Sequence, residues 1–520
     1  TSLQDGRYAA LSMERLLQGA SLTANRDNQG RQPTRLYVNV ARHAPLPAVQ
    51  PADPAQGYTT AEAQAEAARC FPCHCLECVQ VCPYLEHYGA YPKRYIREIY
   101  NNETIVMGVR KSNRMIDSCT LCGLCAAVCP EQLGMGEVCL SARQGMVEKG
   151  RMPVSHHDFA LRDLAFSRSD AFTLARHQPG FEASALLFYP GCQLAASSPD
   201  HVARIYAHLC ERVPGGVGLM LGCCGAPAHW SARDDLFAET RAQFRADWER
   251  LGKPPVVTAC SSCFRMFSDH QPDVPVESLW WLLERVGPPA GATLPARTLA
   301  IHDPCTTRQN TAIHASVRRL AADRGVTTVE LDGAGLTTCC GFGGLAEFAN
   351  REVADKIVDR RIGQNDADYL TYCAMCRDNF ARRGKRAVHI LDLLYPGDDP
   401  AARRDPGFSA RQENRGRLKR RLLRELWGES MNEPAVDVEL VIAPEVQADI
   451  EKKLILLDDI RQTVRHAETS GEKLIDRRSG RSIACHRPVR VTYWVEYTMA
   501  DGRCVVHRAY SHRMELGAAS

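Results

Sequence analysis

Cysteines in two copies of one pattern are the residues best suited to chemistry in this sequence. Each copy reads Cys…Cys-Cys-Gly…Cys-x-x-Cys with similar gaps, so the stretch is a duplicated structural unit. Because the thiols are grouped so tightly in a chain with 23 cysteines, we favour metal ligation over a disulfide framework. The members of the two copies are, in order, Cys192, Cys223, Cys224, Cys260, Cys263, Cys305, Cys339, Cys340, Cys373 and Cys376.

The adjacent cysteines in each copy indicate an iron cluster with unusual ligation. Neighbouring Cα atoms lie about 3.8 Å apart, below the range of roughly 4.4–6.8 Å found in ordinary disulfides. Two thiolates side by side repel each other unless a metal neutralises them. Each copy has one cysteine more than a four-iron cubane needs, so a thiolate is left to bridge irons. Gly225 and Gly341 follow the pairs and allow positive φ and a close backbone approach, although plain turn formation would also explain them.

Two shorter cysteine runs precede the repeated pattern. The first, Cys-x2-Cys-x4-Cys-x3-Cys-Pro, resembles the N-terminal iron–sulfur segment of glutamate synthase small subunits. The second is the run of bacterial ferredoxins, in which the fourth cysteine ligates the other cluster. This resemblance implies one cluster on Cys70, Cys73, Cys78 and Cys129 and another on Cys119, Cys122, Cys125 and Cys82. Cys75 is an alternative ligand beside Cys73, and zinc is the competing metal for paired Cys-x-x-Cys groups.

The repeated pattern resembles the cysteine-rich CCG domains of heterodisulfide reductase catalytic subunits, which also occur in glycolate oxidase iron–sulfur subunits. The resemblance implies that each complete copy holds a noncubane four-iron cluster and that its cysteines form the catalytic site. The predicted cofactors are therefore two cubane and two noncubane [4Fe-4S] clusters. Five cysteines remain outside this assignment, and we interpret two of them, Cys139 and Cys210, as small buried apolar residues. The other three are Cys75, Cys485 and Cys504.

Strands and helices alternate through both copies, which indicates α/β units. Each cysteine group follows an apolar segment of strand length, so we expect the sites to lie outside the carboxyl ends of the strands. Duplicated units of this kind commonly face each other, and we predict a pseudo-twofold arrangement with both sites on one cleft. The predicted strands are 185–189, 218–221, 255–259, 298–302, 326–331 and 369–372, and the predicted helices are 199–213, 315–324 and 347–363.

The remaining segments predict a multidomain chain. Residues 86–115 have the apolar spacing of a helical insertion between the two runs, and residues 140–180 are polar and helical. The basic stretch 411–429 is interpreted as a solvated linker helix, with a docking surface for an acidic partner as the alternative. The tail predicts an α+β domain with strands at 436–442, 489–499 and 504–510 and a helix at 446–468. Its Cys485, His486, Cys504, His507 and His512 are candidates for a zinc site, although their spacing is irregular.

The predicted domain boundaries follow from these segments. They are an N-terminal arm at 1–60, with a short helix near 12–18; an α-helical dicluster ferredoxin domain at 61–180, beginning with a helix at 60–68; a first CCG domain at 181–296; a second at 297–410; a basic linker helix at 411–429; and an accessory α+β domain at 430–520.

Composition excludes several classes of function. The formal net charge of +3 gives no whole-chain argument for binding nucleic acid or lipid. We expect no membrane span, because no apolar run reaches 18 residues, and no N-terminal signal segment is evident. Unpaired cysteines predict a reducing compartment, hence the cytoplasm, with peripheral membrane attachment through a partner as an option. The chain has no Gly-x-Gly-x-x-Gly motif between a strand and a helix, so a flavoprotein or ferredoxin is the expected electron donor, in a hetero-oligomeric complex.

Two functions are consistent with these sequence features. The first is a heterodisulfide reductase-like enzyme, in which cubane clusters relay single electrons to the noncubane clusters and a disulfide is reduced to two thiols. His302 and His229 are candidate polar helpers, although each is more often a structural histidine. The second is an electron-transfer subunit of a flavin-dependent dehydrogenase of the glycolate or lactate type. Intact motifs in both copies favour the enzyme, and the basic helix offers only a weak third interpretation as a nucleic-acid-binding protein.

Overall fold

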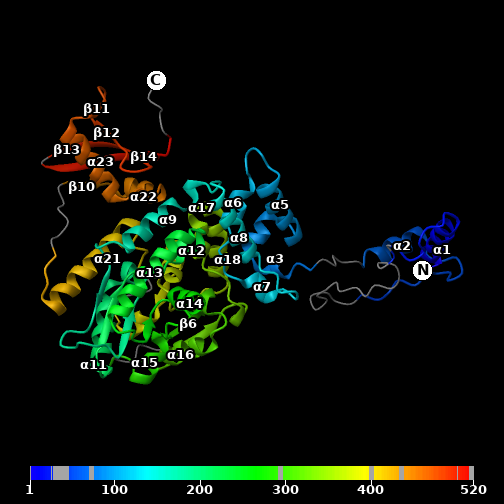
Figure 1. The fold of residues 1–520 in the computed structure, drawn as a ribbon, viewed down its shortest axis with the longest axis horizontal. Coiled ribbons are helices and arrows are strands. Elements are labelled where there is room, and N and C mark those ends of the chain that lie inside the picture. Colours follow the sequence, from blue (N-terminus) through cyan, green and yellow to red (C-terminus); the bar gives the residue numbers. More distant parts are fainter. Residues whose placement is uncertain are drawn as a thin grey trace. The chain divides into compact units, whose positions relative to one another are not determined.

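The structure is a computed structural model that describes residues 2–24, 26, 46–69, 75–290, 297–396, 403–431, 438–500 and 502–514 (Figure 1). The chain divides into two units, residues 1–76 and 77–520, which are described separately. Cys70 and Cys73 lie outside the described residues, so the predicted ligands of the first run are only partly represented. Within the described part, no helix is long and apolar enough to cross a membrane.

The described residues of the first unit form two helices. Helix α1 spans Ser2–Leu17 and is longer than the short helix predicted near 12–18. Helix α2 spans Thr60–Ala67, as predicted, and begins at a capping box in which Thr59 and Glu62 exchange hydrogen bonds. These bonds satisfy amide groups that the first helical turn leaves without partners.

The second unit begins with helices only. The predicted helical insertion is present as α4, α5 and α6, and two helices, α8 and α9, cover residues 140–148 and 154–167 of the next stretch predicted to be helical. Strand β1 (Leu174–Arg176) lies in the stretch 140–180, which was predicted to be helical. This segment is a strand because it pairs with a strand of the following sheet. The helices are α3 (Glu77–Val81), α4 (Pro83–Tyr88), α5 (Pro92–Thr104), α6 (Ser112–Asp117), α7 (Leu124–Val128), α8 (Met135–Glu148) and α9 (Val154–Ser167).

The two copies of the cysteine pattern, called here the first and second repeat, form two sheets with one strand order. The first sheet runs β1-β3-β2-β4-β5 and the second β7-β6-β8-β9, so their parallel parts correspond strand by strand. All predicted strands of the repeats are present, and β5 and β9 were not predicted. The strands are β2 (Leu186–Tyr189), β3 (Val217–Leu221), β4 (Val256–Thr258), β5 (Val276–Ser278), β6 (Arg297–His302), β7 (Val326–Glu330), β8 (Tyr369–Thr371) and β9 (Ala387–His389).

Helices complete each repeat and bury the strands between them. The helix predicted at 347–363 is divided, because Asn350 has an extended φ of −154°. Helices of the first repeat are α10 (Cys192–Ser197), α11 (Pro199–Arg212), α12 (Ala226–Trp230), α13 (Asp234–Arg250), α14 (Ser261–His270) and α15 (Leu279–Val286). Those of the second are α16 (Thr311–Ala322), α17 (Ala346–Ala349), α18 (Arg351–Ile362), α19 (Ala374–Arg382) and α20 (Ile390–Leu394), with a 3-10 turn at Cys305–Thr307.

The basic stretch forms helix α21 (Phe408–Leu422), continued by a π-helical turn at Leu423–Trp427. Arg411, Arg415 and Lys419 recur every four residues on one face of α21, and all three are buried. This face packs against α10 of the first repeat. The interpretation of the stretch as a solvated linker is therefore wrong for this face.

The C-terminal part is an α+β domain, as predicted. Its sheet runs β10-β14-β13-β12-β11, with β10 parallel to β14 and the other pairs antiparallel. The predicted helix at 446–468 is two helices, since Leu454 between them has a φ of +57°. Strands β11 and β12 were not predicted. The elements are β10 (Glu439–Ile442), α22 (Pro444–Lys452), α23 (Leu457–Ser470), β11 (Lys473–Ile475), β12 (Ser482–His486), β13 (Thr492–Ala500) and β14 (Arg503–His512).

Candidate functional site

The five cysteines of the first repeat gather at the carboxyl ends of three adjacent parallel strands. Cys192 follows β2, the pair Cys223-Cys224 follows β3, and Cys260 follows β4. The Sγ atoms of Cys192 and Cys223 are 3.7 Å apart. Gly191 has a φ of +85°, and a Cβ there would lie 3.1 Å from the Sγ atom of Cys263. Only glycine therefore lets the turn before Cys192 approach the other thiols this closely.

The second repeat builds an equivalent group on its own sheet. Cys305 follows β6, the pair Cys339-Cys340 follows β7, and Cys373 follows β8. The Sγ atoms of Cys305 and Cys339 are 4.0 Å apart, and the amide of Gly341 donates a hydrogen bond to the Cys339 sulfur at 3.3 Å. Both groups thus lie where the alternating sequence predicted them, outside the carboxyl ends of the strands.

The thiols of each group interact mainly with one another. Hydrogen bonds from Cys223 and Cys263 lower the pKa of Cys224, and bonds from Cys305 and Cys340 lower the pKa of Cys339. Every cysteine of the repeats is buried or half-buried. A buried set made only of thiols has the chemistry of an iron–sulfur ligand set rather than of an acid–base site. The donor set therefore fits an iron–sulfur cluster.

A third thiol group lies on the helical segment before the repeats. Burial raises the pKa of Cys82, and the nearby thiols of Cys122, Cys119 and Cys125 raise it further. The structure thus places Cys82 beside the second run, as the predicted ligand set requires. Cys78 is on α3, which packs against α7, and Cys129 is the C-cap residue of α7.

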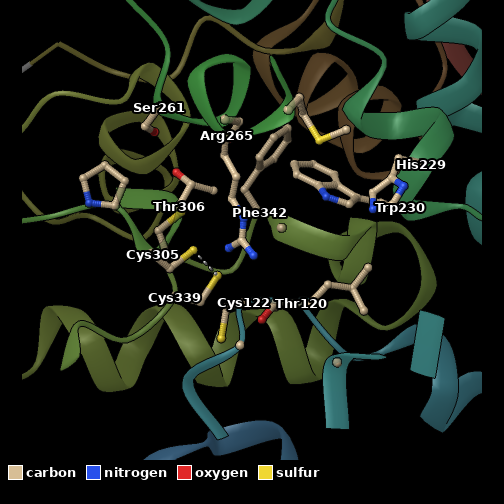
Figure 2. A pocket seen from close by; sticks show the side chains of 18 of the residues that line it. Thr120, Cys122, His229, Trp230, Ser261, Arg265, Cys305, Thr306, Cys339 and Phe342 are labelled. Carbon is tan, nitrogen blue, oxygen red and sulfur yellow. Dashed lines mark hydrogen bonds between the residues drawn. The ribbon is translucent and has the colours of Figure 1, made fainter. Parts of the chain in front are cut away.

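This third group lies directly against the second repeat. After burial, the neighbouring Cys339 is the main cause that raises the pKa of Cys122, and the Thr120 side chain in turn helps to lower the pKa of Cys339. The backbone makes the approach possible, because a Cβ on Gly343 would lie 2.6 Å from the carbonyl oxygen of Thr120. Cys122, Cys305 and Cys339 therefore meet at one junction (Figure 2).

A cavity opens at this junction and extends to the first repeat. Figure 2 shows Cys305, Cys339 and Cys122 along one side and the side chains of Trp230 and Arg265 from the first repeat on the other. A second, smaller pocket holds the first repeat's thiols. The two pockets share five lining residues, Trp230, Ser262, Phe342, Cys373 and Met375. The two repeats thus contribute to one continuous region.

Comparison with known proteins assigns these parts. The 4Fe-4S dicluster domain family matches residues 56–134, and the cysteine-rich domain family matches residues 186–268 and 299–381. The chain joins an iron–sulfur dicluster domain to two cysteine-rich domains. The first and second repeats are accordingly the first and second cysteine-rich domains.

Individual proteins that resemble this chain match about three fifths of it. The chain is 24% identical over 356 residues to a fumarate reductase (CoM/CoB) subunit of Methanothermobacter marburgensis, covering 62% of this chain and 70% of that protein. It is 22% identical over 364 residues to a dihydromethanophenazine:CoB–CoM heterodisulfide reductase subunit of Methanosarcina barkeri, covering 59% and 87%. The predicted resemblance to heterodisulfide reductase is confirmed at this modest identity. The chain is an iron–sulfur electron-transfer protein related to subunits of such reductases.

The two candidate histidines lie in different surroundings. His302 is fully buried and accepts a hydrogen bond from the Arg361 Nε atom at 3.0 Å, and it does not line the cavity. His229 does line the cavity, where its ring lies 4.6 Å from that of His270. Burial, followed by the neighbouring His270, lowers the pKa of His229 to about 4. His302 is therefore a structural residue, and His229 is a neutral lining residue at neutral pH.

Buried arginines beside the first cysteine-rich domain were not predicted from the sequence. Arg415 is fully buried, donates a hydrogen bond to the carbonyl oxygen of Cys192 at 3.1 Å and pairs with Asp163 at 2.7 Å. Arg411 on the same face pairs with Asp378, which lies two residues after Cys376. The spacing of four residues between these arginines could have indicated one buried helix face. The high overall charge of the stretch favoured a solvated helix instead.

The remaining cysteines do not form a further centre. Cys139 is fully buried beside Cys119 and contacts the Tyr84 hydroxyl at 3.6 Å, and Cys210 is half-buried. Cys504 lies in the core of the C-terminal domain, whereas Cys485 is half-exposed on β12. Among the described residues of the C-terminal domain, no three His, Cys, Asp or Glu side chains are grouped to hold a metal ion. The zinc interpretation of the C-terminal domain therefore has no structural support.

Proposed function

We propose that this protein is the disulfide-reducing iron–sulfur subunit of a larger oxidoreductase complex. The observation that carries the proposal is the junction of the Cys122, Cys305 and Cys339 thiols beside one cavity. Cys122 of the dicluster domain lies against Cys305 and Cys339, and the same cavity reaches Trp230 and Arg265 of the first cysteine-rich domain. A path for electrons and a space for substrate thus share one wall.

The predicted cofactor assignment is kept as part of this proposal. The two runs would each hold a cubane [4Fe-4S] cluster, and the five cysteines of each cysteine-rich domain would hold a noncubane one. Bound clusters supply reversible one-electron chemistry and, in a cluster with an open iron, affinity for sulfur. The proposed domain boundaries are those predicted from the sequence.

The chain's own residues would bind and orient the substrate. Reduction of a disulfide consumes two electrons and two protons, breaks the S–S bond and releases two thiols. The Ser261 hydroxyl is buried at the cavity wall, and the Thr306 hydroxyl is buried there too. Neither hydroxyl has a hydrogen-bond partner among the residues that the structure describes. These hydroxyls, from opposite domains, are suited to donate to sulfur atoms in the cavity.

An electron-conduit role is the second candidate, because one relative is named as a subunit of a fumarate reductase. In that case the cysteine-rich domains would pass electrons onward rather than reduce a disulfide. Under either role the proposed donor is a flavoprotein or ferredoxin, in a hetero-oligomeric complex.

Anaerobic iron analysis combined with disulfide turnover tests the proposal. Four four-iron clusters require about sixteen iron atoms per chain, and electron paramagnetic resonance should show a new signal when the oxidised protein meets a thiol. A preparation with half that iron, and with an unchanged iron content in Cys339→Ala, would exclude the noncubane pair. Full iron content without turnover of any disulfide, in the presence of a reduced donor, would favour the conduit.

A further inference from the structure

Arg308 joins the dicluster domain to the second cysteine-rich domain at the junction of their thiols. It lies three residues after Cys305, at the end of the 3-10 turn Cys305–Thr307. One guanidinium nitrogen, Nη1, donates to the carbonyl oxygen of Cys122 at 2.7 Å. The other, Nη2, donates to the carbonyl oxygen of Thr337 at 2.8 Å, just before the Cys339-Cys340 pair. One planar fork therefore holds two cysteine-bearing loops together.

The position of the charge adds to this geometry. Arg308 holds a positive charge beside Cys122, where it opposes the effects of burial and of Cys339 on that thiol. The neighbouring thiols of Cys339 and Cys122 both raise the pKa of Cys305. A guanidinium remains protonated at any working pH, so the charge is permanent. A fixed positive charge stabilises the more negative, reduced form of a neighbouring redox group.

We propose that Arg308 is a positioning residue for electron transfer between the dicluster domain and the second cysteine-rich domain. It holds the Cys122 loop against Cys305 and Cys339, and its charge raises the reduction potential of the iron–sulfur group held by Cys122. The proposal rests on the proposed function only in requiring that these thiols ligate iron–sulfur groups.

The chain provides a matched control in Arg360. Its Nη1 atom donates to the carbonyl oxygen of Gln80 at 3.2 Å, and its guanidinium also pairs with Glu86. Arg360 thus joins the same two domains, from α18 to the α3–α4 segment, but it does not line the cavity at the thiol junction. Loss of Arg360 removes a bridge between the domains without removing charge at Cys122.

Redox titration of full-length Arg308→Gln, Arg308→Lys and Arg360→Gln tests the proposal, with iron content and the paramagnetic signals as readouts. We expect Arg308→Gln to lower the potential of one cubane signal and to slow reduction of the second cysteine-rich domain by a reduced ferredoxin. Arg308→Lys keeps the charge but loses the fork, so it should retain most of the potential while still slowing the transfer. Arg360→Gln should change neither.

Hydrogen exchange on the same proteins checks the positioning role independently of turnover. Arg308→Gln should increase exchange in the peptide containing Cys122, and Arg360→Gln should increase it in α3 and α4 instead. Equal shifts of potential in Arg308→Gln and Arg360→Gln, no shift in either, or loss of iron from both Arg308 variants would overturn the proposal. Unchanged exchange at Cys122 would do the same. A parent that lacks disulfide turnover but shows the Arg308 effects would instead contradict only the proposed function.

Discussion

The two cysteine-rich domains have the same strand order and cysteine pattern, but different neighbours surround their thiols. The second domain faces the dicluster domain, with Cys305 and Cys339 beside Cys122. The first faces α21, where the buried Arg415 holds the carbonyl oxygen of Cys192. The two domains thus carry similar groups of cysteines, and the contacts around each group differ.

The loop after each Cys-Cys-Gly turn shows the origin of the difference. The second domain continues Phe342-Gly343-Gly344, whereas the first continues Ala226-Pro227-Ala228. Gly344 has a φ of +61°, and a Cβ there would lie 2.8 Å from the carbonyl carbon of Thr120. Only the glycine-containing loop can therefore accept the backbone of the second ferredoxin run. Gly343 and Gly344 thus leave room for the backbone at Thr120 beside the thiols of the second domain.

The largest effect is expected when one thiol is removed from either cysteine-rich domain. Cys224→Ala and Cys340→Ala should each abolish disulfide turnover while the cubane clusters remain reducible. In Cys224→Ala the second domain should still be reduced by ferredoxin, whereas in Cys340→Ala electrons should reach neither cysteine-rich domain. Cys122→Ala should block both. Freeze-quenched paramagnetic resonance follows each step, and parental turnover in either thiol variant would leave only the conduit role.

Exchange of the loop residues is the second way to test the comparison. Gly344→Ala introduces the residue of the first domain at a position with positive φ and no room, at a cost of about 1–3 kcal/mol. We expect a lower melting temperature and slower electron transfer from the dicluster domain. The matched change Ala228→Gly should cost about 1 kcal/mol in backbone entropy, in addition to the packing of a fully buried methyl group, and should leave transfer unaffected. Similar transfer rates in the two variants would show that the glycine loop does not determine the contact.

Beside the first domain, substitution of Arg415 should lower the stability of the protein. Arg415→Leu leaves Asp163 without its partner, and breaking such a buried pair costs about 3 kcal/mol, the low end of the usual range. The low end applies because the Asp163 side chain keeps 23% of its exposure. Denaturant unfolding should show the loss, and iron should become labile in the first domain only. Arg421→Leu on the same helix breaks an exposed pair with Asp200 and should change stability by less than about 1 kcal/mol.

The smallest effect is expected for His229. Burial and then His270 lower its pKa to about 4, so its proton is lost well below neutrality and the ring stays neutral at higher pH. His229→Gln should therefore leave the shape of the pH–rate profile unchanged between about pH 6 and 8, where an unperturbed histidine titrates. An inflection in the parent that disappears in the variant would contradict this assignment.

The cysteine groups and the strands that carry them were predictable from the sequence, because both depend on local spacing. Ligand runs such as Cys119 to Cys129 and the alternation of apolar strands with helices need only neighbouring residues. Breaks within helices were missed, since Asn350 and Leu454 interrupt patterns that are otherwise periodic. The expected donor, the cytoplasmic location and the pseudo-twofold arrangement stay predictions.

The sequence by itself determined the cysteine pattern and the strands that carry it, and the tertiary structure decided which thiols are neighbours. Cys122 meets Cys305 and Cys339, and Arg415 meets Cys192, although each pair is separated by well over one hundred residues. No local pattern encodes such a contact, because it depends on the shapes of two surfaces that form only when each part has folded. The buried face of α21 illustrates the same cause, since its arginines are paired by acids from α9 and α19 rather than by neighbours on the helix.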